Sequence, residues 1–130
     1  EQCEDAPCVK VCPTGAAYVN DDGIVSINEG KCVGCLYCVA ACPYKVRFIN
    51  PETKAPDKCD FCKESRLARG EDPACVSVCP TQALTFGDAN DVNSEVSKLL
   101  DTKLNYQHKM NLGTKPRVYR IPSRKGGINV

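Results

Sequence analysis

The feature that most constrains this chain is a run of four cysteines closed by a proline, with the spacing C-x2-C-x2-C-x3-C-P over residues 32–43. Three thiolates two residues apart on a tight loop can converge on three irons of one cubane cluster. The fourth cysteine, Cys42, follows one helical turn later and is expected to point away, toward a second cluster. Pro43 has no backbone N–H and cannot continue the helix. The run therefore predicts iron–sulfur ligation.

The number and spacing of the cysteines also bear on the three other interpretations: disulfides, structural zinc and covalent haem. Eleven of the 130 residues are cysteine, an odd number that disulfide pairing would leave incomplete, and cysteines this close in sequence rarely reach disulfide geometry with each other. Structural zinc uses paired C-x2-C knuckles, which Cys59–Cys62 followed by Cys75–Cys79 could supply. Covalent haem is excluded because no C-x2-C is followed by histidine. A zinc-structured interaction module is thus the alternative.

The composition suggests that metal stabilises the fold. The apolar residues make up 42% of the chain, but that figure includes the cysteines, and without them roughly a third is apolar, with no Trp and three Phe. Such a composition provides little for a self-sufficient core. The length supports one domain or two small lobes. The longest apolar run, over residues 33–42, is too short to span a bilayer.

A short pattern occurs three times: C-x3-C-P, a turn, and an apolar stretch, with prolines at 13, 43 and 80. We predict a hairpin over residues 14–27 around an Asp-Gly turn, and further strands at 46–49 and 84–86. Residues 50–58 are predicted to form a polar loop, and 63–74 a charged surface insert with one helical turn. A capped helix is expected at 93–100.

These elements predict an α+β fold with short β-hairpins and short helices around iron–sulfur clusters. We expect this domain at 1–87 and an irregular C-terminal extension at 88–130. The end of the extension is basic and has no acid, and its cations are Lys109, Lys115, Arg117, Arg120, Arg124 and Lys125. It could wrap the domain, dock on a partner or bind nucleic acid. We predict docking by residues 109–130, and no nucleic acid, because no base-stacking module accompanies the charge.

The charged residues near the central run, the single histidine and the first cysteines allow further predictions. Lys31, Lys45 and Arg47 flank the central run and are expected to be solvated, with tuning of a nearby cluster as the other interpretation. The single histidine, His108, is expected at the surface because no companion ligand lies near it. Near the start, the spacing of Cys3, Cys8 and Cys12 matches a four-ligand run that would need one more cysteine immediately before Glu1. We therefore expect the chain to be a piece that begins inside a motif.

The motifs together resemble those of a known family. The chain is similar to the four-cluster [4Fe–4S] ferredoxin-like electron-transfer subunits of bacterial respiratory reductases, and within them to the iron–sulfur C proteins of formate-dependent nitrite reductase systems. The resemblance covers essentially the whole chain. It is carried by Cys8-x3-Cys12-Pro13-Thr-Gly-Ala, Cys32-Val-Gly-Cys35-x2-Cys38-x3-Cys42-Pro43-Tyr-x2-Arg47, Lys58-Cys59-Asp-Phe-Cys62 and Ala74-Cys75-x3-Cys79-Pro80-Thr-x-Ala83.

This resemblance implies ligation that crosses between motifs, with two to four [4Fe–4S] clusters in the full-length protein. The implied sets are Cys12, Cys32, Cys35 and Cys38 for one cluster, Cys3, Cys8 and Cys42 for a second, Cys59, Cys62 and Cys75 for a third, and Cys79 for a fourth. Apart from the first set, each would be completed by residues that precede Glu1.

The resemblance also implies a function. Single electrons would pass between an integral membrane quinol-oxidising subunit and a terminal reductase or cytochrome, in nitrite reduction during anaerobic respiration, at the periplasmic face of the bacterial inner membrane. The sequence has no dinucleotide motif, P-loop or Cys/His nucleophile, so we expect an electron carrier with no catalytic residues. A catalytic iron–sulfur hydratase is disfavoured, since its cluster needs an iron left open for substrate.

Overall fold

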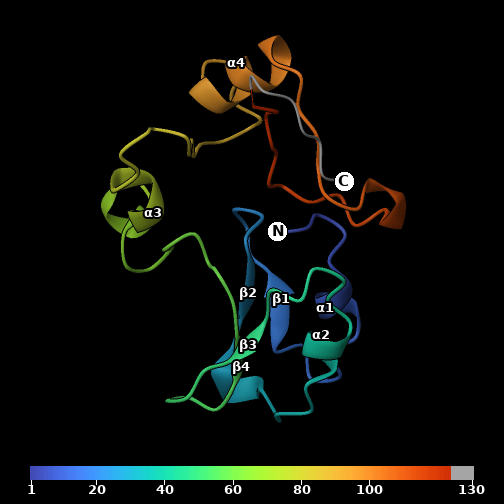
Figure 1. The fold of residues 1–130 in the computed structure, drawn as a ribbon. Coiled ribbons are helices and arrows are strands. Elements are labelled where there is room, and N and C mark those ends of the chain that lie inside the picture. The colour runs from blue at the N-terminus through green and yellow to red at the C-terminus, as the bar shows by residue number, and fades with distance from the viewer. Residues whose placement is uncertain (124–130) are drawn as a thin grey trace. The chain divides into compact units, whose positions relative to one another are not determined.

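The structure, a computed structural model, describes residues 1–123 as two units of short helices and short antiparallel strands (Figure 1). The first unit comprises Glu1–Asp60 and Gln107–Tyr119, and the second comprises Phe61–Tyr106 with residues 120–123. The predicted α+β class is confirmed. The boundary expected at residue 87 lies inside the second unit. Two cations of the predicted docking segment, Arg124 and Lys125, lie outside the described residues.

Two small sheets lie in the first unit. Strands β1 (Ala17–Val19) and β2 (Val25–Ile27) form the predicted hairpin, with Val19 opposite Val25. Strand β3 (Phe48–Ile49) pairs with β4 (Pro56–Asp57), so the prediction of a loop throughout residues 50–58 was wrong. Asn50 accounts for the difference. It closes the connection by donating its N–H to the Ala55 carbonyl at 2.9 Å and accepting the Lys54 N–H at 2.9 Å.

The threefold pattern found in the sequence has one local conformation. Each copy has a four-residue helix, namely α1 (Pro7–Lys10), α2 (Tyr37–Ala40) and α3 (Ala74–Ser77). After each helix, the third residue beyond the second cysteine adopts left-handed φ and donates its N–H to that cysteine's carbonyl. These residues are Gly15 (φ 66°), Lys45 (φ 52°) and Gln82 (φ 50°). The repeat is therefore a repeat of structure as well as of sequence.

The second unit holds helix α4 (Glu95–Thr102), whose N-cap is Ser94: its Oγ accepts the Ser97 N–H at 3.1 Å. The helix predicted at 93–100 is thus confirmed with a shift of two residues. The strand predicted at 84–86 was wrong, because these residues pair with no strand among those described. Instead, the Phe86 ring packs edge-on against Phe61, with centroids 5.1 Å apart.

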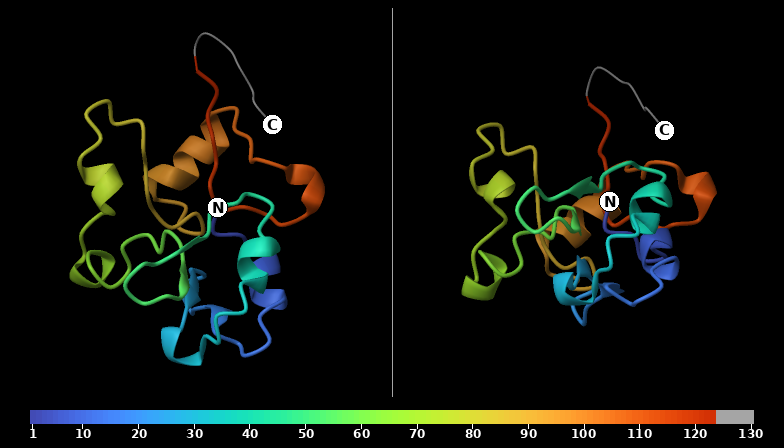
Figure 2. Two further views of the ribbon diagram at one scale, coloured as in Figure 1. Left: turned by 60° about the horizontal axis from the view of Figure 1, so that its bottom comes forward. Right: turned by 90° about the horizontal axis from the view of Figure 1, so that it is seen from below.

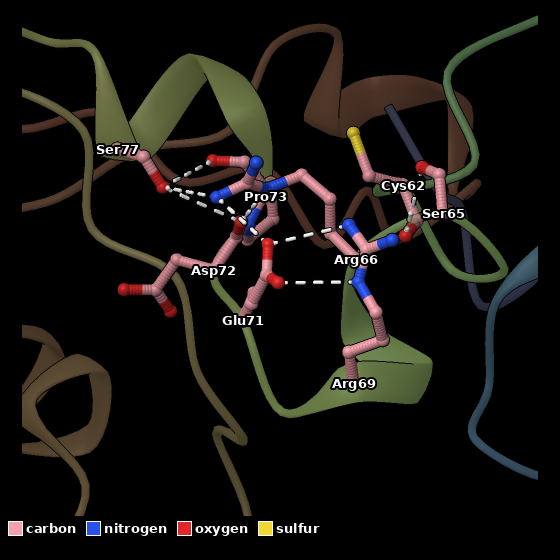
Figure 3. A network of polar contacts seen from close by, with 8 residues as sticks. All are labelled: Cys62, Ser65, Arg66, Arg69, Glu71, Asp72, Pro73 and Ser77. Atoms are coloured by element: carbon pink, nitrogen blue, oxygen red, sulfur yellow. Dashed lines mark hydrogen bonds and ion pairs between the residues drawn. The ribbon is translucent and has the colours of Figure 1, made fainter.

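The charged insert at 63–74 contains one helical turn, as predicted, in the 3-10 helix η2 (Leu67–Arg69). Arg66 organises it (Figure 3). Its Nε donates to the Asp72 carbonyl at 2.5 Å, and its Nη2 lies 3.3 Å from a Glu71 carboxylate oxygen and 3.1 Å from Ser77 Oγ. These contacts tie the insert to the start of α3. Further 3-10 helices are η1 (Glu29–Lys31) and η3 (Met110–Leu112).

The basic segment 107–119 packs on the first sixty residues. The carbonyls of Thr114 and Lys115 accept the N–H groups of Asp5 and Glu4, and the hydroxyl groups of Thr114 and Tyr44 lie 2.6 Å apart. Thr114 is buried. For residues 107–119 the structure therefore fits a tail that wraps its own domain, while docking of residues 109–130 on a partner stays a prediction.

The apolar core is small. Within residues 1–123, its central cluster of buried residues is Cys3, Ala6, Cys8 and Val25, while large side chains such as Val33, Val78 and Val92 are mostly exposed. Two of the four cluster members are thus cysteines, so their sulfurs supply packing that aliphatic side chains supply elsewhere. No helix within residues 1–123 has the length and apolar character needed to cross a membrane.

Candidate metal centres

One cavity in the first unit, here called site A, is lined by four cysteines from two distant parts of the chain. They are Cys12, Cys32, Cys35 and Cys38. The loop between Cys32 and Cys38 curves around the cavity because Gly34 and Leu36 both adopt left-handed φ, 69° and 61°. Only glycine takes that conformation without cost, so Leu36 is a strained position. Leu36 also lines the cavity.

Neutral donors surround the Cys12 sulfur at site A. The Ala17 N–H points at Cys12 Sγ from 3.3 Å, and the Thr14 hydroxyl lies 3.7 Å away. The hydrogen bond from Ala17 is the main reason that the pKa of the Cys12 thiol falls to about 7. Burial has the opposite effect on Cys38, whose pKa it raises. Cys12 is therefore prepared for the thiolate form, which is the form that binds metal.

A second cavity in the same unit, site B, is lined by Cys3, Cys8 and Cys42. Cys3 and Cys8 are buried. Gln2 fixes the backbone beside Cys3, because its Oε1 accepts the Val25 N–H at 2.7 Å and its Nε2 donates to the Cys59 carbonyl at 2.6 Å. Burial raises the pKa of the Cys3 thiol. Two cysteines of this site are thus more buried than any of site A, where Cys35 is exposed.

Arg47 lines site B, and its guanidinium is buried, with the residue only 6% exposed. Its Nη2 donates to Cys8 Sγ at 3.1 Å, while Nε and Nη1 are buried with no hydrogen-bond partner. The expectation of a solvated side chain was wrong for Arg47 and holds for the exposed Lys31 and Lys45. The one signal that distinguished Arg47 was its place in the motif that carries the resemblance, to which Lys31 and Lys45 do not belong. Lys58 also lines site B, and burial lowers its pKa to about 8.

Helices α1 and α2 lie side by side and connect the two sites (Figures 1 and 2). Helix α1 carries Cys8 at site B and is followed by Cys12 at site A. Helix α2 carries Cys38 at site A and is followed by Cys42 at site B. Four residues of helix span about 6 Å. Each helix therefore carries a cysteine of one site and leads, within one helical turn of chain, to a cysteine of the other.

The donor set suits a cluster better than a single ion. Within residues 1–123, no three His, Cys, Asp or Glu side chains form a group that could hold one metal ion. Site A nevertheless has four thiols around one cavity. A zinc ion draws four sulfurs to about 2.3 Å, whereas in a cubane each sulfur binds a different iron. All eleven cysteines are free of disulfides.

The unpartnered nitrogens of Arg47 give a second, independent indication at site B. An isolated buried cation costs several kcal/mol unless an anion compensates it. Thiolates and the sulfides of an iron–sulfur cluster are anionic hydrogen-bond acceptors. The residues of both sites thus fit clusters: Cys12, Cys32, Cys35 and Cys38 would hold one, and Cys3, Cys8 and Cys42 would contribute three thiolates to another.

The remaining cysteines divide between the units: Cys59 belongs to the first, and Cys62, Cys75 and Cys79 belong to the second. Cys79 repeats the surroundings of Cys12, since the Ala83 N–H lies 3.3 Å from its sulfur and the Thr81 hydroxyl lies 3.6 Å away. The Thr81 hydroxyl is the main cause of its lowered pKa. These donors on its sulfur support the expectation that Cys79 is a metal ligand, which stays a prediction.

Two cavities are each lined by thiols, and α1 and α2 each carry a cysteine of one cavity and lead to a cysteine of the other. This arrangement defines an iron–sulfur protein with two interleaved cysteine sets. Comparison with known families gives the particular family. A family model described as "4Fe-4S dicluster domain" matches residues 1–89, and the chain belongs to this family. The resemblance to ferredoxin-like subunits is thereby confirmed, and [4Fe–4S] clusters are the cofactors of this family.

Curated relatives match over nearly the whole chain. It is 62% identical over 127 residues to the B subunit of polysulfide reductase from Wolinella succinogenes, a match that covers 98% of this chain and 66% of the relative. It is 55% identical over 130 residues to protein NrfC of Escherichia coli, covering 99% and 58%. It is 53% identical over 107 residues to the thiosulfate reductase electron transfer subunit PhsB of Salmonella typhi, covering 82% and 55%. The chain thus spans somewhat less than two thirds of these relatives.

Proposed function

We propose that the chain transfers single electrons within a reductase complex, and that sites A and B each hold a [4Fe–4S] cluster. The observation that carries the proposal is the crossing of the cysteine sets: α1 carries Cys8 of site B and leads to Cys12 of site A, while α2 carries Cys38 of site A and leads to Cys42 of site B. Two centres linked by such short segments are held in one unit. When bound, the clusters would supply one-electron chemistry, while the protein sets their potentials through hydrogen bonds, burial and charge.

The residues around each site have definable tasks in this function. At site A, the Ala17 N–H and the Thr14 hydroxyl stabilise negative charge on Cys12. At site B, Arg47 does so at Cys8. The buried positions of Cys3 and Cys8 limit the access of water. The third and fourth sets, Cys59 with Cys62 and Cys75, and Cys79, are proposed as ligands of further clusters.

The partners proposed are an integral membrane quinol-oxidising subunit and a terminal reductase, at the periplasmic face of the inner membrane. The names of the relatives support a reductase partner, because they include polysulfide and thiosulfate reductase subunits. The higher identity to the polysulfide reductase subunit favours reduction of a sulfur compound. The identity of 55% to NrfC supports nitrite reduction as the second candidate.

Deletion of the gene tests this function. Membranes from the deletion strain should lose quinol-linked reduction of one acceptor among polysulfide, thiosulfate and nitrite, and the gene supplied on a plasmid should restore it. Loss with polysulfide or thiosulfate alone would select the sulfur-compound reductase, and loss with nitrite alone would select the second candidate. Full retention with all three would contradict a role in these reductases. Fractionation of the same cells tests the proposed location.

A further inference from the structure

The guanidinium of Arg47 is the most conspicuous charged group that ligation leaves unused. It is buried at site B, it donates one hydrogen bond to Cys8 Sγ at 3.1 Å, and its Nε and Nη1 have no partner. Arg47 therefore has donors to spare in a cavity whose other lining residues include Cys3 and Cys42. A fixed fork of donors is the geometry in which arginine binds an anion most effectively.

The hydrogen-bond donors on cysteine sulfurs differ between the two sites. At site A, the donors found on a cysteine sulfur are neutral: the Ala17 N–H and the Thr14 hydroxyl at Cys12. At site B, the donor on Cys8 carries a full positive charge in a buried position. Hydrogen bonds from charged donors are roughly twice as strong as neutral ones. A cluster that accepts an electron becomes more negative, so a buried cation favours its reduced form.

We propose that Arg47 is a potential-tuning residue that raises the reduction potential of the cluster at site B above that of the cluster at site A. This inference rests on the proposed assignment of one cluster to each site. Electron transfer between the two clusters would then favour reduction of the site B cluster, because the electron resides preferentially where the cation lies. The burial of the guanidinium makes the effect strong, since water screens it little.

Potentiometric titration followed by electron paramagnetic resonance tests the proposal on the intact, cluster-loaded protein. Arg47→Gln removes the charge and keeps an N–H donor. We expect it to lower the equilibrium constant for reducing the site B cluster about tenfold relative to site A, which corresponds to about 59 mV for one electron. Arg47→Lys retains the charge and should restore most of this shift. Lys45→Gln removes an exposed cation two residues away and should shift neither cluster.

A second measurement keeps the test decisive if Arg47→Gln fails to assemble. With ¹⁵N-guanidino arginine in the wild-type protein, pulsed electron paramagnetic resonance should detect ¹⁵N coupling to the reduced site B cluster, and Arg47→Lys should remove it. Absence of coupling, or equal potentials in wild type and Arg47→Gln, would overturn the proposal. Iron and sulfide contents that show both clusters present would then leave the electron-transfer function standing, whereas absence of clusters would defeat that function itself.

Discussion

Sites A and B have the same kind of ligand and are linked through α1 and α2, yet they lie in different surroundings. Site A is bordered by the loop from Cys32 to Cys38, and Cys35 is exposed. Site B is lined in part by the first residues of the chain, with Cys3 and Cys8 buried and the Arg47 guanidinium against Cys8. The ligand motif therefore specifies which metal group binds, and segments outside the motif determine how buried and how charged each site is.

The largest expected effect comes from breaking the crossed ligation. Cys12→Ser should remove the cluster at site A and leave the one at site B, although Cys12 lies twenty residues before the central motif. Cys42→Ser should do the reverse, although Cys42 lies within that motif. Electron paramagnetic resonance with iron analysis measures both. If Cys42→Ser and Cys35→Ser destroy the same cluster, the crossing is wrong.

Exposure predicts the order in which the clusters are lost. The site A cluster should be removed first by a chelator, because Cys35 is exposed while site B has two buried cysteines. Removing both clusters should abolish most of the cooperative melting of the first unit, since its core is small and metal binding contributes folding free energy. Absorbance and circular dichroism during chelation measure the two effects. Simultaneous loss of both clusters would contradict the expected difference between the sites. A sharp melting transition without iron would show that the apolar core alone is enough to fold the first unit.

Substitutions of two threonines test whether each site can be destabilised without affecting the other. Thr114→Val removes the hydroxyl that lies 2.6 Å from the Tyr44 hydroxyl on the segment covering the first unit. We expect a loss of about 1–3 kcal/mol in the free energy of unfolding, with faster loss of the site B cluster. Thr14→Val is the control at site A, where the Thr14 hydroxyl lies as far as 3.7 Å from Cys12 Sγ. It should cost less than about 0.5 kcal/mol. Equal effects in urea unfolding would mean that the covering segment does not favour site B.

The smallest expected effects concern the left-handed turn residues that follow Cys12 and Cys42. Gly15 has φ 66°, and no heavy atom lies within 4 Å of the position that a Cβ would take, so Gly15→Ala should destabilise by about 1 kcal/mol through backbone strain alone. Lys45 has φ 52°, and Lys45→Gly should stabilise by about 0.5 kcal/mol, since relief of strain exceeds the added entropy of the unfolded chain. Urea unfolding of the cluster-loaded variants measures both. A stabilising Gly15→Ala would contradict this reasoning.

Local patterns predicted much of the fold, whereas contacts between distant segments were missed. The hairpin at 14–27 and the helix near 93–100 depend on turn and capping residues that are neighbours in sequence. Strand β4 was missed because Pro56 and Asp57 have low strand propensity and pair only through the turn closed by Asn50. The covering role of residues 107–119 depends on carbonyls of Thr114 and Lys115, which no side-chain pattern reports.

At the candidate sites, spacing predicted the cysteines as metal ligands, and the resemblance implied which of them group together. The burial of Arg47 could not be predicted, because a cation beside a cysteine motif has the same sequence whether it faces water or metal. Its partner Cys8 is 39 residues away. Tertiary structure alone brings the guanidinium and the sulfur together.

The most direct test of the central claim is a crystal structure of the protein purified without oxygen, with anomalous diffraction measured at the iron edge. We predict one cubane peak bounded by the sulfurs of Cys12, Cys32, Cys35 and Cys38, and a second bounded by those of Cys3, Cys8 and Cys42. A single cluster held by Cys32, Cys35, Cys38 and Cys42, or a zinc edge in place of the iron edge, would contradict the account.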